Sequence, residues 1–430
     1  MTQAAVPDAF SARSGLAYGL LGLPLAFVAL PLYVILPNHY AREFGMPLAT
    51  LGAILLGARL FDALVDPLLG RLSDRLFARS TGSVLRLGAL AAGVLALGFT
   101  LLFFPLQRVQ DSRSALSLWA GVMLMLTYAA YSALSVSHQS WGAMLGGNEA
   151  ERSRIVAWRE GLGLVGVVLA SITPVALGLP ATTALFFVAI LAGWLAWRRA
   201  PEPVARHGGH APAAGALWLP FQSRAFRRLL AVFMLNGIAS AVPATLVLFF
   251  IQDRLQAPQR MEPLFLGSYF LAAALSIPLW LAMVKRLGLA RTWLAGMALA
   301  IAVFAWASQL GAGQTLAFAA VCALSGVALG TDLALPGALL AGVIQANGHS
   351  GQAEGAYFGW WNFATKLNLA LAAGLALPLL GLFGYAPGSR DGSALTALVV
   401  AYCVLPCILK LMAAASAWFF LIQPSESVAS

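Results

Sequence analysis

Two aspartates and an arginine interrupt a strongly apolar stretch of the chain. Arg59, Asp62 and Asp66 occur in the segment RLFDALVDPLLGRLSDR, residues 59–75. In a helix that turns 100° per residue, the three side chains fall within about 60° of one another and form one stripe. Two carboxylates at this spacing repel when both are ionised, so they favour a proton or another cation bound between them. The pattern predicts a cation-coupling site, with a structural alternative in which Arg59 pairs with Asp62 and Asp66 caps a neighbouring backbone.

Three further ionisable groups lie in apolar segments nearer the C-terminus. Lys366 is the expected second cation of the coupling site, because a lysine facing the acid pair would compete with the bound ion. Asp332 is predicted either to face the same cavity and contact the solute or to pair locally with another helix. Lys410 is predicted to be structural, with its ammonium group snorkelling towards the membrane surface.

The elements that carry these residues are membrane spans. Of the 430 residues, 60% are hydrophobic and 10% are charged, whereas a soluble domain has about 25% charged residues. Apolar stretches long enough to cross a bilayer core of about 30 Å recur along the whole chain. Twelve are predicted, at residues 16–37, 48–70, 83–104, 116–145, 155–178, 180–197, 228–252, 262–284, 289–309, 313–346, 355–383 and 393–422.

The basic residues indicate the orientation of these spans. The net charge is +10, but most of the 26 Lys and Arg residues fall in loops on one side of the predicted membrane, which argues against nucleic acid as a partner. By the positive-inside rule, both termini lie in the cytoplasm, as in a multi-pass protein of a bacterial inner membrane. No removable signal peptide is expected. The three cysteines are expected to be buried packing residues, with no disulfide and no metal.

The longest polar interval divides the spans into two sets of six. Residues 198–227 are rich in Pro, Gly and Ala and are predicted to form a central cytoplasmic linker between bundles at 1–197 and 228–430. His207 and His210 in this interval are expected to be solvated loop residues. The predicted fold is therefore an all-α integral membrane protein of about twelve transmembrane helices in two six-helix bundles, the arrangement of major facilitator proteins.

Three segments resemble one transporter family. The motif Arg59-x-x-Asp62-Ala-x-x-Asp66-Pro-x-x-Gly70-x-x-x-Asp74-Arg75 is similar to helix two of the glycoside-pentoside-hexuronide:cation symporters, the melibiose permease family of the major facilitator superfamily. Residues 354–366, EGAYFGWWNFATK, and residues 329–336, LGTDLALP, resemble that family's helices eleven and ten. The resemblance implies that Asp62 and Asp66 hold the coupling cation, that Lys366 lies beside them, and that Trp361 and Asn362 contact the solute.

The same resemblance suggests a gate and one more solute contact. Gly70, Asp74 and Arg75 match the superfamily's loop between helices two and three, where charges bind helix ends and latch one face of the transporter. The alternative of plain positive-inside topology explains Arg75 but not Asp74. Arg159 matches the loop between helices four and five and is expected to reach the cavity.

The chain also departs from the family pattern. Val65 replaces an asparagine of melibiose permeases and offers a metal ion no oxygen, so H⁺ is the expected coupling ion, with Na⁺ as the alternative. The sugar-binding carboxylates of helices one and four are absent, so galactoside specificity is not expected. Helix four instead has aromatic and neutral polar side chains suited to a hydroxylated or partly apolar solute, namely Tyr128, Tyr131, His138 and Trp141, with packing as the alternative for His138 and Trp141.

The sequence therefore predicts a secondary active transporter, not an enzyme, that couples H⁺ movement to transport of a small sugar-like solute without a cofactor. A lysolipid or amphiphile carrier of the same superfamily is the main alternative. An intramembrane prenyltransferase is a remote one, because it needs a second acidic motif that the later spans lack. The oligomeric state is left open, a monomer included.

Overall fold

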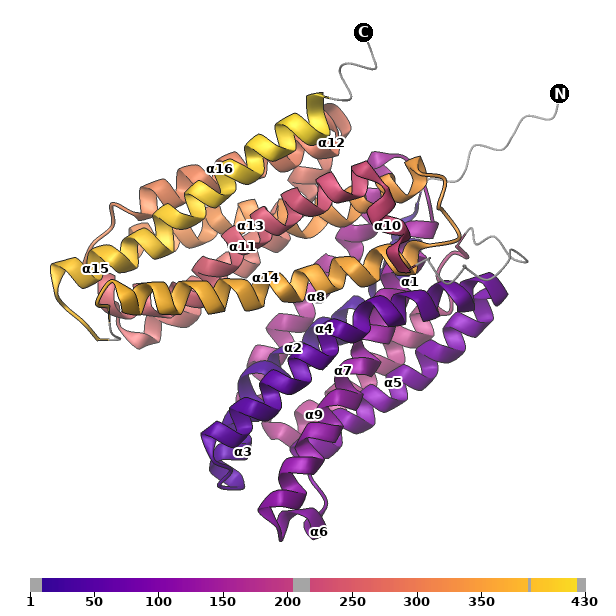
Figure 1. Cartoon of the computed structure of the whole chain (residues 1–430), viewed down its shortest axis with the longest axis horizontal. Coiled ribbons are helices and arrows are strands. Elements are labelled where there is room, and N and C mark those ends of the chain that lie inside the picture. The colour runs from indigo at the N-terminus through magenta and orange to yellow at the C-terminus, as the bar shows by residue number, and fades with distance from the viewer. Residues whose placement is uncertain (1–9, 204–216, 386–387, 424–430) are drawn as a thin grey trace. The chain divides into compact units, whose positions relative to one another are not determined.

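Figure 1 shows the chain as a computed structural model that describes residues 10–203, 217–385 and 388–423. Helices account for nearly all of this part of the chain, and no strand occurs in it. The predicted residues His207 and His210 lie outside it. The chain divides into two compact units, Met1–Pro220 with Ile344–Phe363, and Phe221–Val343 with Ala364–Ser430.

The first unit contains the helices before the polar interval. Its first span is broken into α1, α2, a π-helical turn and α3, where Pro31 and Pro37 interrupt the regular hydrogen bonding. The remaining helices are long and mostly continuous. The bounds are α1 Ala12–Gly19, α2 Gly22–Leu30, α3 Leu36–Glu43, α4 Leu48–Arg79, α5 Thr81–Phe103, α6 Gln107–Gln110, α7 Arg113–Met144, α8 Glu149–Ala176 and α9 Gly178–Trp197.

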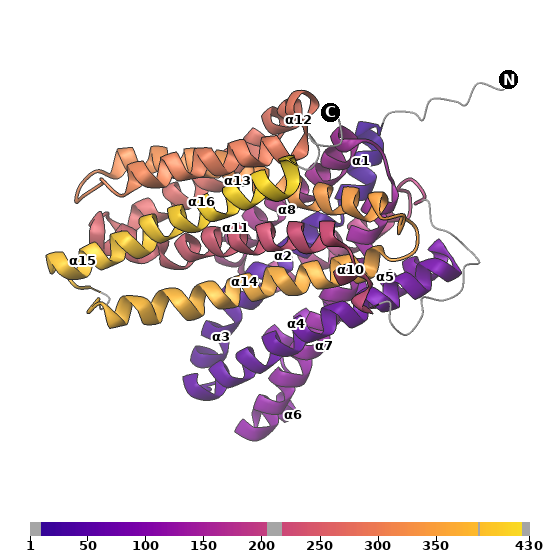
Figure 2. The same ribbon diagram turned by 45° about the horizontal axis from the view of Figure 1, so that its top comes forward.

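The second unit contains most of the later helices. The bounds are α10 Leu219–Gln222, α11 Arg224–Phe249, α12 Glu262–Ala307, α13 Thr315–Ala346, α14 Glu354–Leu382, α15 Gly392–Val399 and α16 Leu405–Ala417. The first half of α10 and the ends of α13 and α14 nearest residue 350 are assigned to the first unit. A π-helical turn, Val400–Val404, joins α15 to α16. α16 lies against α11 and α12 (Figure 2).

The expected number of spans is confirmed. Within the described residues, nine helices are long and apolar enough to cross a membrane. One of them, the 46-residue α12, contains Gly288 at φ 77 and ψ 172, where the helix breaks and a second span begins. α4 with 32 residues and α14 with 29 residues are also long enough. The described residues therefore agree with about twelve crossings, and the chain is an integral, multi-pass membrane protein.

Local capping explains why several helices start earlier than their apolar stretches. α8 begins at Glu149 because Asn148 and Glu151 form a capping box, in which each side chain accepts from the other's backbone N–H. α7 begins after Ser112, whose hydroxyl accepts from the N–H of Ala115. Hydropathy alone does not register these polar first turns, so the predicted spans began several residues late.

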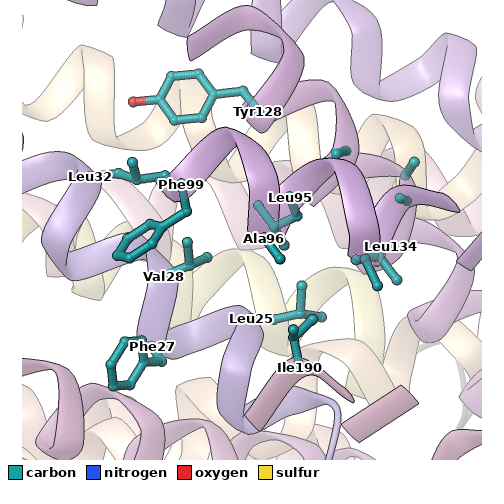
Figure 3. Close-up of a cluster of buried hydrophobic side chains, with 14 of the residues drawn as sticks. Leu25, Phe27, Val28, Leu32, Leu95, Ala96, Phe99, Tyr128, Leu134 and Ile190 are labelled. Atoms are coloured by element: carbon teal, nitrogen blue, oxygen red, sulfur yellow. The ribbon is translucent and has the colours of Figure 1, made fainter. Parts of the chain in front are cut away.

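A shared core holds the first unit together. α4 and α5 pack on α7, and α2 packs on α8 and α9 (Figure 1). Figure 3 shows Leu25 and Phe27 from α2 near Phe99 from α5, Leu134 from α7 and Ile190 from α9. Lipid is as apolar as these side chains, so close packing rather than removal from water provides most of the attraction between the helices.

Glycines allow the closest helix crossings. A Cβ atom added at Gly70 of α4 would lie 2.0 Å from the carbonyl oxygen of Gly355, and one added at Gly355 of α14 would lie 2.1 Å from that of Gly70. Gly166 on α8 makes a similar approach to the Leu23 carbonyl, at 2.1 Å. Small residues that let helix backbones touch are typical of membrane bundles.

Candidate functional site

The two aspartates of α4 are deeply buried. Asp62 is 2% exposed and Asp66 is 0% exposed. Ser132 on the neighbouring helix α7 donates a hydrogen bond of 2.8 Å to Oδ1 of Asp62. Pro67 follows Asp66 within α4 and has no backbone N–H. The carbonyl of Ala63, one turn earlier, therefore lacks its usual donor within the helix. A buried carboxylate pair in a helix of this kind is the chemistry of a cation-binding or proton-binding site.

Aromatic rings lie next to this acid pair. The guanidinium carbon of Arg59 lies 4.8 Å from the centre of the Tyr33 ring, which is a cation–π contact. The rings of Tyr33 and Tyr128 are 6.0 Å apart. Tyr128 was predicted from the sequence, whereas Tyr33, at the broken end of the first span, was missed. Its only signal in the sequence is an aromatic residue two positions after Pro31.

Tyr131 links the acid pair to a second charged pair. Tyr131 interacts electrostatically with Asp62 and Asp66 of α4 and also with Arg159 and Glu160 of α8. Arg159 and Glu160 form an ion pair in which both side chains are partly exposed. Arg159 therefore lies in the same part of the first unit as the predicted coupling residues. Glu160 was not predicted as a site residue, although it directly follows Arg159 in the sequence.

His138 and Trp141 lie in the packed interior of the first unit. His138 is 0% exposed, and its Nε2 lies 2.7 Å from the Tyr18 carbonyl oxygen. Its ring is tilted against the Tyr18 ring and meets the Trp197 ring edge to face. Trp141 donates from Nε1 to the Pro201 carbonyl at 3.0 Å. These are the contacts of packing residues, and contact of either side chain with a solute stays a prediction.

Asp74 binds the beginning of α14. Its two carboxylate oxygens accept from the backbone N–H groups of Gly355 and Ala356 at 2.6 and 2.8 Å. A carboxylate here satisfies two unpaired amides and complements the positive end of the helix dipole. The expected contact of Asp74 with a helix end is therefore present, beside the crossing of Gly70 with Gly355. Arg75 is exposed, and the gating role of all three residues stays a prediction.

The predicted residues of helix eleven lie on α14. Trp361 is 6% exposed, and the Asn362 and Lys366 side chains are half-buried. Residues up to Phe363 belong to the first unit and those from Ala364 to the second. The relation of Lys366 to Asp62 and Asp66 stays a prediction.

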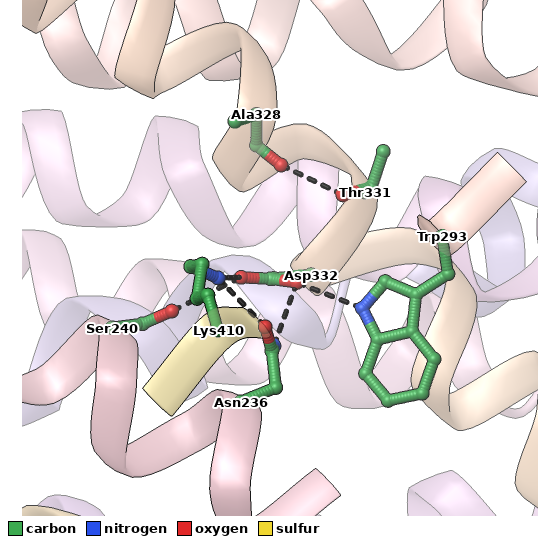
Figure 4. Close-up of polar contacts among 7 residues, drawn as sticks. All are labelled: Asn236, Ser240, Trp293, Ala328, Thr331, Asp332 and Lys410. Carbon is green, nitrogen blue, oxygen red and sulfur yellow. Dashed lines mark hydrogen bonds and ion pairs between the residues drawn. The ribbon is translucent and has the colours of Figure 1, made fainter. Parts of the chain in front are cut away.

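Asp332 and Lys410 form an ion pair inside the second unit. Lys410 Nζ lies 3.2 Å from Oδ2 of Asp332 and donates to Oδ1 of Asn236 at 2.7 Å (Figure 4). Lys410 is only 5% exposed, so the prediction that it snorkels to the membrane surface is wrong. The reason is a nearby partner: pairing with Asp332 lowers the cost of keeping the ammonium group in the bundle. Asp332 thus has a local partner on another helix, and its contact with a solute stays a prediction.

A protein-family model identifies the family of this chain. The model described as MFS/sugar transport protein matches residues 14–423, nearly the whole chain. The chain belongs to the MFS/sugar transport protein family. Membership in the sugar-transporting part of the major facilitator superfamily, expected from the helix-two and helix-eleven motifs, is thereby confirmed.

A curated relative agrees with this family. A putative sulfoquinovose importer of Salmonella typhimurium is 30% identical over 165 residues, which are 38% of this chain and 34% of the importer. The chain thus matches about a third of the length of that curated relative.

Solved structures share the fold of this family member. A bacterial homologue of the iron transporter ferroportin, in an outward-facing state, has a TM-score of 0.72 at 16% identity, with 95% of this chain and 98% of that chain covered. The fucose:proton symporter of E. coli has a TM-score of 0.68 at 14% identity, with 96% and 99% covered. At these identities the likeness shows the major facilitator fold alone.

Proposed function

We propose that this chain is a secondary active transporter that couples H⁺ movement to the transport of a small, sugar-like solute. The observation that carries the proposal is the buried acid pair of α4, Asp62 at 2% and Asp66 at 0% exposure. Membership in the MFS/sugar transport protein family supports transport rather than catalysis. The match to transporters also leaves the prenyltransferase alternative without support.

The acid pair can couple because its charge must be compensated. A charged side chain at the membrane centre costs about 2.5 to 3.5 kcal/mol on insertion scales, so two adjacent buried carboxylates favour uptake of one positive charge. Uptake or release of that charge changes the electrostatics at Tyr131 and at the Arg159–Glu160 pair, with which Tyr131 also interacts. Occupancy of the acids by a cation is thus linked to the state of side chains that could contact a solute.

The side chains around the acids favour H⁺ as the cation. A hard metal ion such as Na⁺ is expected to want about six oxygen ligands, by analogy with the rule for Ca²⁺ and Mg²⁺. α4 has Val65 next to Asp66, where an oxygen-bearing residue would be needed, and Ser132 supplies one hydroxyl beside Asp62. A proton needs only one carboxylate oxygen.

The surroundings of the acids favour a hydroxylated solute. Tyr33 and Tyr128 offer aromatic faces for the C–H surface of a ring, and the Arg59 guanidinium offers hydrogen-bond donors. The names of two similar proteins, a sulfoquinovose importer and a fucose:proton symporter, agree with a sugar-like solute.

Charge distribution supports a location in a bacterial inner membrane with both termini in the cytoplasm. Clusters of arginine occur at the ends of spans predicted to face inwards, for instance Arg71, Arg75 and Arg79 at the end of α4.

Transport by purified protein in liposomes tests the proposal. Monosaccharides, glycosides and uronides are offered with an imposed pH gradient, an imposed Na⁺ gradient, or neither, and solute accumulation is measured. We expect accumulation with the pH gradient and its loss in Asp66→Asn, since the amide no longer binds the proton. Exchange of labelled for unlabelled solute should persist in this variant, because exchange needs no net proton movement.

A matched substitution separates coupling from general damage. Asp111 is exposed at the end of α6, so Asp111→Asn should transport as the unmodified protein does. Equal accumulation by Asp66→Asn and the unmodified protein would refute the coupling role, and accumulation that follows only the Na⁺ gradient would refute H⁺ as the cation.

A further inference from the structure

The second unit contains a partly open cavity next to the Asp332–Lys410 pair. Its volume is about 190 Å³, and α11, α12, α13 and α16 contribute its walls. Most of the lining is aliphatic or aromatic, including Phe270, Phe304 and Leu329, while Tyr269 and Tyr402 add hydroxyl groups. A cavity of about 150 Å³ can hold a benzene molecule, so this one is large enough for a molecule built on a single ring.

Asp332 has no acceptor capacity left for a ligand. Its Oδ1 accepts from Asn236 Nδ2 at 2.9 Å and from Trp293 Nε1 at 2.8 Å, and its Oδ2 accepts from Ser240 Oγ at 3.1 Å and Lys410 Nζ at 3.2 Å (Figure 4). A carboxylate has about four lone-pair positions, and these four donors occupy them. A ligand that approached Asp332 with a donor group would therefore find no acceptor.

Lys410 does have a donor to offer. An ammonium group has three N–H bonds, and in the described part of the chain Lys410 uses two of them, towards Asn236 and Asp332. Lys410 lines the cavity, so the third N–H can be directed to an occupant. The matching group on that occupant is a hydrogen-bond acceptor.

The charge of the cavity selects for a neutral occupant. Asp332 and Lys410 are the two charged residues of its lining, and they compensate each other. A charged molecule would bring an unbalanced charge into a low-dielectric interior, which is costly. An uncharged molecule with one acceptor oxygen avoids this cost.

We propose that this cavity is a binding site for a small uncharged amphiphile, whose ring or short chain lies among the aromatic side chains and whose oxygen accepts from Lys410. The site lies wholly within the second unit, whereas the acid pair lies in the first. The inference is therefore independent of the proposed H⁺ coupling, and its test does not use transport.

A matched pair of ligands tests the acceptor. Benzyl methyl ether and propylbenzene have the same shape, but only the ether has an oxygen. Phenylacetate and phenethylammonium serve as charged probes. Cys322 lines the cavity, so each probe should slow its alkylation by a maleimide in protein whose other cysteines are replaced, Cys403→Ala and Cys407→Ala, in lipid nanodiscs.

We expect the ether to protect Cys322 at a concentration roughly tenfold lower than propylbenzene, because its hydrogen bond is to a charged donor. The charged probes should protect least. Equal protection by the ether and propylbenzene, or stronger protection by either charged probe, would overturn the proposal.

Two variants test whether the probes protect Cys322 by binding in this cavity. Asp332→Asn with Lys410→Met keeps the site neutral and should reduce protection by the ether to that by propylbenzene, while propylbenzene is unaffected. Ala328→Phe leaves the ion pair intact and fills part of the cavity, so it should abolish protection by both probes. Preference for the ether that survives in the double variant, or unchanged protection in Ala328→Phe, would show that binding occurs elsewhere.

Discussion

Asp74 shows how one carboxylate can cap a helix whose first turn lies 281 residues later in the chain. Asp74 lies near the end of α4 and accepts from the first-turn amides of α14, as a local N-capping side chain would do. Hydrogen bonds to a charged group contribute about 1.5 to 3 kcal/mol each. The beginning of α14 therefore depends on the position of α4.

Substitution of Asp74 should loosen this end of α14. In Asp74→Ala, the Gly355 and Ala356 amides lose their acceptors, so we expect their hydrogen exchange to accelerate by at least about tenfold. Hydrogen–deuterium exchange with mass spectrometry measures this directly, with Asp111→Ala as the exposed control. Unchanged exchange in the peptide that contains Gly355 would mean that α14 is capped in another way.

His349 gives a prediction about pH outside the spans. Burial lowers the pKa of His349 below its ordinary value of 6.5, and its Nδ1 lies 2.9 Å from the Tyr357 hydroxyl. Because the folded state favours the neutral imidazole, the stability gained from this contact is present near neutral pH and is lost as the pH falls through the lowered pKa. NMR titration of labelled histidine, with His349→Gln to assign the signal, should give a pKa below 6.5. A pKa above 6.5 would contradict the burial seen here.

Single residues were predicted unevenly from the sequence. The burial of Asp62 and Asp66 follows from charge within an apolar helix, and the expectation was correct. The partner of Lys410 was not predictable, since Asp332 lies 78 residues earlier and hydropathy does not show which helix faces meet. His138 illustrates the same limit, because a polar ring bonded to a carbonyl in the core has the same sequence signature as one in a cavity.

At the scale of elements, the contact between α4 and α14 depends on Gly70 and Gly355, where the two helix backbones are in direct contact. Each approaches the other's carbonyl oxygen too closely for any side chain. Both lie within a turn or so of the Asp74 contacts. Close approach of the backbones therefore places the Asp74 carboxylate within reach of the α14 amides.

Substitution of Gly70 should separate these helices. Gly70→Ala places a methyl group against a backbone oxygen that cannot rotate away, so we expect a loss of about 1 to 3 kcal/mol and a lower apparent unfolding temperature. Gly52→Ala is the control on the same helix, because nothing lies within 4 Å of its added Cβ. It should be neutral or slightly stabilising, since alanine favours a helix over glycine. Equal effects of both changes would show that the crossing is not tight.

At the scale of the whole molecule, the predicted twelve spans and helical fold were correct, because length and hydropathy suffice to identify them. The breaks within spans were not predicted: the π-helical turns at Pro31–Ile35 and Val400–Val404 depend on how proline-freed carbonyls are satisfied by neighbours. Division of α13 and α14 between the two compact units was also not expected from the sequence, because it depends on contacts between distant helices.

The twelve predicted crossings are an even number, so they predict that the two termini lie on the same side of the membrane. We expect a green fluorescent protein to fluoresce in a bacterial host when fused to either end, since it folds only in the cytoplasm in this setting. Fluorescence from one fusion alone would require an odd number of spans. If neither fusion fluoresced, the orientation proposed from the arginine clusters would be reversed.

The break in α12 has a consequence for proteolysis. Two crossings are joined there by Gly288, without a loop, and the exposed basic residues Lys285, Arg286 and Arg291 all lie in helix. A protease must draw several residues of extended chain into its active site, so trypsin should leave this connection intact although three of its target residues are accessible. A map of cleavage sites would report α12 as one protected segment and miss the point at which the chain reverses.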